Sequence, residues 1–124
     1  MQKLARVFGY VFVAVGVLGF VPGVTTASGQ LLGIFQVDGL HNIVHLLTGA
    51  LALVAASGAG TNARLYFQVF GVVYALVTVL GFLSGSVLGM MTNGADNVLH
   101  LVIAADALYI GFGMKEEPAG GAQV

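Results

Sequence analysis

The sequence predicts an all-α integral membrane protein, a four-helix bundle made of two tandem two-helix hairpin repeats. Of the 124 residues, 58% are hydrophobic and 7% are charged, and the mean hydropathy is +0.99. The charged residues leave several apolar runs long enough to cross a bilayer, and the first half of the chain resembles the second. In a typical soluble domain about a quarter of the residues are charged. The low charged fraction of this chain therefore excludes a soluble globular domain.

Four membrane spans are expected, near residues 5–22, 40–57, 64–84 and 96–113. A spanning helix needs about 20 apolar residues to cover roughly 30 Å of hydrocarbon. Lipid offers no hydrogen-bonding partner, so the backbone must be satisfied within each helix. Residues 1–114 are therefore expected to form one transmembrane domain, followed by a polar cytoplasmic tail over 115–124.

The cations predict the orientation of the spans. Lys3 and Arg6 precede the first run, Arg64 lies between the second and third, and Lys115 follows the fourth. Lys and Arg favour the cytoplasmic side, so both termini are expected in the cytoplasm, with the protein in a bacterial cytoplasmic membrane. Residues 1–27 also resemble a signal peptide, but the repeat argues that they are retained as a span.

The repeat is visible by direct alignment. Residues 7–23 and 69–85 share 10 of 17 positions, and residues 41–53 and 96–108 share 6 of 13. Two spans return the chain to its starting side, so both copies cross in the same sense, with a pseudo-twofold axis along the membrane normal. The glycines that recur as Gly9 and Gly71, and as Gly19 and Gly81, predict close packing of the first helix on the third.

A polar signature opens the second and fourth helices. It comprises two groups, Asp38, His41, Asn42 and His45, then Asn93, Asp96, Asn97 and His100. Asp38, Asn93 and Asp96 are expected to cap the helices. Residues four apart share one helix face, so His41 and His45 form one stripe. The pseudo-twofold makes His45 equivalent to His100, and the two are expected to approach each other.

Three interpretations of this signature remain open. The first is a hydrogen-bonded network that joins the second and fourth helices through His45, His100, Asn42 and Asn97. The second is a divalent metal site formed by His41, His45, His100 and Asp96. The third is haem b with His45 and His100 as axial ligands, although no outer cation is present to bind its propionates.

Asp106 stands apart from the signature, because its repeat partner is Leu51. It lies about 15 Å below Asp96 by helical rise, near mid-membrane. An unpaired carboxylate at that depth is costly, so we expect a protonated acid that donates to Tyr74, Thr78 or a backbone carbonyl. An acid within the membrane also suggests a channel or transporter component.

The paired motifs His41-Asn42-x-x-His45 and Asp96-Asn97-x-x-His100 resemble those of a bacterial family of four-helix membrane proteins of unknown function. The resemblance covers nearly the whole chain except the tail. It implies four spans and carries no activity with it.

Composition narrows the function classes further. The chain has no cysteine, which excludes disulfides and iron–sulfur clusters, and its net charge of -1 without a basic cluster excludes nucleic-acid binding. No phosphate-binding loop or hydrolase motif is found. We expect a non-enzymatic structural or accessory subunit without a cofactor, packed against lipid and other membrane proteins or a second copy. A metal or haem protein and an Asp106-dependent channel are the alternatives.

Overall fold

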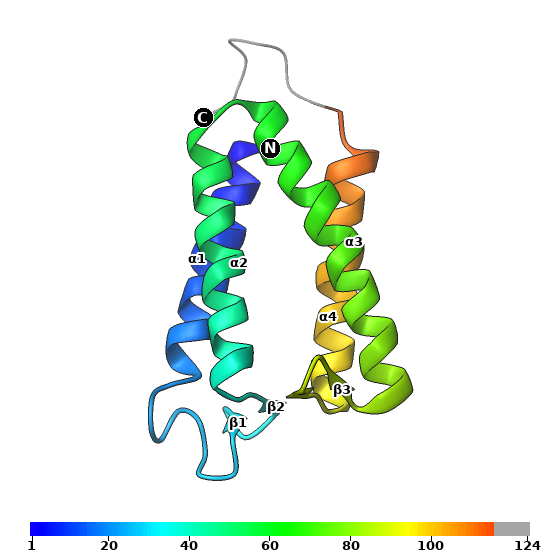
Figure 1. Ribbon diagram of the computed structural model, residues 1–124. Helices are drawn as coiled ribbons and strands as arrows, with labels where there is room; N and C mark the ends of the chain where they lie inside the picture. The colour runs from blue at the N-terminus through cyan, green and yellow to red at the C-terminus, as the bar shows by residue number, and fades with distance from the viewer. Residues whose placement is uncertain (116–124) are drawn as a thin grey trace.

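The computed structural model describes residues 1–115 and is mostly helical (Figure 1). Its helices are α1 (Gln2–Leu18), α2 (Gly39–Ser57), α3 (Gly60–Ser84) and α4 (Gly94–Leu108), and α4 continues as the π-helix η1 (Tyr109–Gly113). Beyond Lys115, the predicted tail lies outside the described residues.

Three segments are long and apolar enough to cross a membrane, namely Gly39–Ser57, Thr61–Ser84 and Gly94–Gly113. These segments indicate a membrane protein. Helix α1 has 17 residues, a length of about 26 Å at 1.5 Å per residue, which is slightly less than the hydrocarbon thickness of about 30 Å. The helix begins three residues before, and ends four residues before, the span predicted near 5–22.

A turn ends α1 at Leu18. The N–H groups of Phe20 and Val21 bond carbonyls three residues back, at 3.0 and 3.1 Å, rather than four. The Thr25 hydroxyl donates to the Leu18 carbonyl at 3.0 Å. Pro22 has no N–H with which to continue the helix, so the apolar residues after Leu18 belong to the loop.

The helices pack as two antiparallel pairs, α1 against α2 and α3 against α4 (Figure 1). Glycines allow the close approach within each pair. Gly9 faces Leu53 and Gly49 of α2, and Gly71 faces Leu108 of α4. The predicted packing of α1 on α3 through these glycines is wrong, because each glycine contacts the helix next to it in the chain.

The two pairs meet at the end of the molecule where α2 turns into α3. A shared apolar core forms there from Ala5, Ala52, Ala56, Ala63, Tyr66, Phe67, Ala107 and Ile110. At the same end, each pair has bonds of its own. Arg64 of α3 donates to the carbonyls of Gly111 and Met114, at 2.8 and 2.7 Å, and Gln2 of α1 bonds the Gly58 carbonyl after α2. The start of α1, the α2–α3 connection and the end of η1 therefore lie together.

Two short β-hairpins, which the sequence analysis did not predict, occupy the opposite end. Strand β1 (Gln30–Leu31) pairs antiparallel with β2 (Phe35–Gln36), and β3 (Ser86–Val87) pairs with β4 (Met90–Met91). Each turn places a leucine at positive φ, +55° at Leu32 and +50° at Leu88. Leu31 and Val87 are buried, so the hairpins cover the ends of the helix pairs.

Replacing Gly49 by Ala should destabilise the protein by about 1–3 kcal/mol, the usual cost of overpacking. A Cβ at Gly49 would lie 2.7 Å from the Gly9 carbonyl oxygen and 2.8 Å from the Val13 backbone nitrogen. Thermal unfolding in detergent, followed by circular dichroism, measures the loss. Gly39→Ala in the same helix is the control, because its added Cβ meets nothing within 4 Å. Equal stability of the two variants would contradict the packing described.

Candidate metal centre

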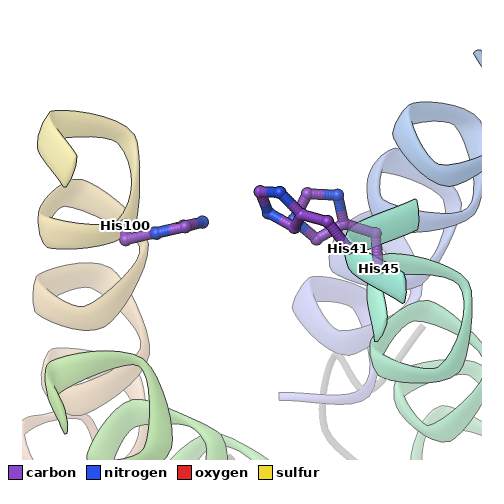
Figure 2. A group of neighbouring side chains, drawn as sticks. All are labelled: His41, His45 and His100. Atoms are coloured by element: carbon purple, nitrogen blue, oxygen red, sulfur yellow. The ribbon is translucent and has the colours of Figure 1, made fainter. Parts of the chain in front are cut away.

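Three histidines meet between the two helix pairs. Helix α2 supplies His41 and His45, one turn apart, and α4 directs His100 toward them (Figure 2). The ring centroids of His41 and His45 are 4.3 Å apart, and that of His100 lies 5.7 Å from His41 and 6.3 Å from His45. All three residues are buried, with 2–4% of their surface exposed. The predicted approach of His45 to His100 is therefore present.

The ring nitrogens lie close enough together to suggest a shared ligand. One nitrogen from each histidine can be chosen so that all three lie within 4.8 Å of one another. Imidazole is a common ligand for zinc, copper, iron and nickel. This cluster, referred to below as the histidine centre, consists of His41, His45 and His100.

A backbone carbonyl fixes the His41 ring. Its Nδ1 lies 3.1 Å from the carbonyl oxygen of Gln36 in β2. A carbonyl only accepts, so Nδ1 carries the proton and Nε2 keeps its lone pair. Metal-binding histidines usually donate their second N–H to such an acceptor, which orients the ring. His41 is thus held in the tautomer that a metal ion requires.

The other two rings retain unsatisfied nitrogens. Within the described part of the chain, Nδ1 of His45 and Nδ1 of His100 are buried without a hydrogen-bond partner. A buried polar atom without a partner costs about 1–3 kcal/mol, and native proteins keep few of them. Two such atoms on two rings of one cluster favour a ligand-binding role over a purely structural one.

The histidines line a cavity of about 130 Å³ that also receives the side chains of Thr48, Tyr74 and Thr92. Ligand pockets for drug-sized molecules measure about 300–1,000 Å³, and a porphyrin belongs in that range. The described cavity is smaller than such a pocket, and it is large enough for a single ion with a small additional ligand.

Asp96 serves a different purpose from the predicted metal ligand. Its Oδ2 accepts the N–H of Asn93 at 3.0 Å and the N–H of Gln36 at 3.1 Å, and its own N–H donates to Oδ1 of Asn93 at 2.9 Å. This is a capping box at the start of α4. The side chain also links α4 to β2, and it is not a member of the histidine centre.

The other predicted caps are confirmed. Asp38 accepts the N–H of His41 at 2.8 Å at the start of α2, as Asn93 does for Asp96 at the start of α4. These caps set the helix starts, and they place His41 and His100 within the first two turns.

The predicted network of histidines and asparagines is wrong. Asn42 packs against Gly19 of the α1 end, and Asn97 packs against Gly81 of α3. The Oδ1 atoms of both asparagines are buried, and no described residue bonds them. Each asparagine therefore faces its own helix pair and does not bridge α2 to α4.

Asp106 also differs from expectation. Its side chain is exposed, and no hydrogen bond or ion pair is found for it within residues 1–115. The predicted partners are engaged elsewhere, since Tyr74 contacts the Thr48 hydroxyl at 3.2 Å and Thr78 donates to the Tyr74 carbonyl. Asp106 instead lines a groove of about 220 Å³ between α1 and α4, and His45 reaches this groove too.

The sequence patterns did not assign Gln36, Tyr74 or Thr92 to the histidine centre. Gln36 acts through its backbone, which no side-chain pattern reveals, and Thr92 precedes the α4 cap as an ordinary loop residue. Tyr74 lies in α3, with its ring centroid 5.6 Å from that of His100. No feature of the sequence pairs Tyr74 with the histidines, because the signature lies in the other two helices.

Comparison with protein-family models gives a match. A family model described as a domain of unknown function (DUF4383) matches residues 2–113, a range that contains all four helices and the three histidines. No curated protein and no solved structure matches the chain. These comparisons indicate no activity, so function is inferred below from the geometry of the site.

Replacing Asp96 by Ala should destabilise the protein by about 1–3 kcal/mol, because two buried N–H groups lose their acceptor. Asp96→Asn keeps an acceptor oxygen and should lose less. Thermal unfolding in detergent compares the two variants with the parent. If both variants were as stable as the parent, the cap and the link to β2 would carry no weight.

Proposed function

This chain belongs to the DUF4383 family, whose domain has no known function, and from its geometry we propose that it is a small membrane protein that binds one transition-metal ion. The observation that carries the proposal is the meeting of three buried imidazoles from two helices, with ligand nitrogens within 4.8 Å. Histidine 41 is already oriented by the Gln36 carbonyl.

The distances are compatible with ion binding after a small adjustment. A tetrahedral ion with bonds of about 2.0–2.1 Å holds its ligand nitrogens roughly 3.3 Å apart, so the rings would move inward by an ångström or so. His100 sits on a different helix pair from His41 and His45. Bound metal would thus join α2 to α4 near the hairpin end.

The donor set narrows the choice of metal. The chain has no cysteine, and no carboxylate belongs to the described cluster. Calcium and magnesium require oxygen ligands, whereas imidazole suits zinc, copper, nickel and iron. The proposal is limited to these four metals.

The proposed setting is a bacterial cytoplasmic membrane that α1 crosses as a fourth span. Four cations lie at the start of α1, at the start of α3 and after η1, namely Lys3, Arg6, Arg64 and Lys115. The preference of Lys and Arg for the cytoplasmic side favours a cytoplasmic location for this end of the helix pairs. The histidine centre then faces the outer half of the membrane. Matching asparagine–glycine contacts and matching leucine turns in the two halves support a tandem repeat.

The proposed role within the cell is that of a non-enzymatic accessory subunit that carries the ion. Many large apolar side chains are exposed along the helices, among them Leu47, Leu76 and Val102. Such a surface suits lipid, a second copy or another membrane protein. An alternative role in a channel or transporter is favoured by one observation, the unpaired Asp106 in a groove that reaches His45.

Elemental analysis tests the proposal. Purified protein, loaded with zinc, copper or nickel and then desalted, should retain about one ion per chain. Replacing His41, His45 or His100 by Gln should each lower the affinity by more than the roughly 10–100-fold that loss of an outer-shell partner costs, because a direct ligand is lost.

Two controls separate metal binding from folding. Asp106→Asn alters an acidic group that does not belong to the histidine centre, and this variant should retain the ion. Circular dichroism checks the helical content of every variant. Failure of the folded parent to retain any of these metals, or full retention by all three histidine variants, would refute the proposal.

A further inference from the structure

We infer that the histidine centre is an open site, in which the bound ion keeps one coordination position toward the cavity and takes a small monoanion there. The inference rests on the proposed metal binding and adds a ligand class to it. The monoanion class includes hydroxide and linear anions of the size of azide.

The number of protein ligands is the first argument. Within the described chain the cluster offers three donors, each a histidine. Asp96, four residues before His100, already accepts two backbone N–H groups, and Asp38, three residues before His41, accepts the His41 N–H. Closed structural zinc sites have four protein ligands, whereas three ligands with one exchangeable position are typical of open sites. The fourth position is therefore left to a molecule from solution.

The cavity is the second argument, because it gives that molecule a place. All three histidines line the same space of about 130 Å³, and a water molecule takes about 30 Å³ of liquid volume. The space is therefore large enough for the ion and a small ligand. The buried residues Val87 and Met90 of the second hairpin also line it, and they limit the ligand's size.

A residue that lines the cavity, Thr92, also has a buried hydroxyl that no described residue bonds. Thr48 donates its hydroxyl proton to the Val44 carbonyl at 2.8 Å, so the Tyr74 hydroxyl, 3.2 Å away, donates to Thr48. Thr92 differs from these two, because its Oγ1 is buried and no described residue bonds it. Thr92 also lines the cavity, so its unbonded hydroxyl is the donor assigned to a metal-bound anion.

Charge selects an anion over a neutral ligand. A divalent ion held by three neutral imidazoles keeps its double positive charge. Among the described residues, no carboxylate lines the cavity, and the buried Asp96 is bonded to backbone N–H groups outside it. An uncompensated charge in an apolar interior is costly. A monoanion halves the net charge, and an ion of this kind also favours hydroxide over water near neutral pH.

Azide titration of the cobalt-loaded protein tests the inference. Cobalt(II) is the probe, because its visible absorption reports coordination number and ligand exchange. Azide should change the visible bands with saturation at one azide per cobalt, whereas benzoate, which is much larger, should leave them unchanged.

The matched variants are Thr92→Val and Thr61→Val. Thr92→Val should weaken azide binding by at least about tenfold, the loss expected for a hydrogen bond to a charged group, and it should leave the cobalt stoichiometry intact. Thr61 is exposed at the start of α3, so Thr61→Val should match the parent in both measurements.

The outcomes separate the inference from the proposed function. If cobalt binds at one per chain and azide leaves the spectrum unchanged, the site is closed and the inference fails while metal binding stands. If benzoate binds as well as azide, or Thr92→Val binds azide normally, the assignment of the ligand to this cavity is overturned. If cobalt, zinc, copper and nickel are all lost on desalting, both fail.

Discussion

A buried imidazole must find a partner for each of its nitrogens, and this constraint governs the architecture. Three imidazoles lie between the helix pairs, where apolar side chains and a small cavity surround them. Of the described ring nitrogens, Nδ1 of His41 has a backbone acceptor, while Nδ1 of His45 and Nδ1 of His100 have none. Under the proposal, a shared metal ion would give one nitrogen of each ring a partner.

The remainder of the fold leaves that interface free for the histidines. Glycines such as Gly49 and Gly71 bring the helices together within each pair. The core around Phe67 joins the pairs at the end where α2 turns into α3. At the other end, Asp96 links α4 to the first hairpin. The pairs are therefore joined at both ends, and the middle of the interface contains polar groups.

Structural features that depend on a single helix were predicted well from the sequence. Hydropathy located the helices to within a few residues, and the spacing of His41 and His45 placed both on one face. Structural features that depend on tertiary packing were not predicted correctly. Recurring glycines show that helices approach closely but not which ones, so the α1–α3 contact was wrong. The surroundings of Asp106 depend on helix rotation, which the sequence does not determine.

X-ray absorption spectroscopy of the protein loaded with one zinc ion per chain tests the central claim most directly. If the histidine centre binds the zinc, the spectrum should show three imidazole nitrogens and one further light atom at about 2.0–2.1 Å from the metal, with the outer-shell scattering that imidazole rings produce. A spectrum with oxygen ligands alone and no imidazole scattering would contradict it, since the zinc would then lie outside the cluster formed by His41, His45 and His100.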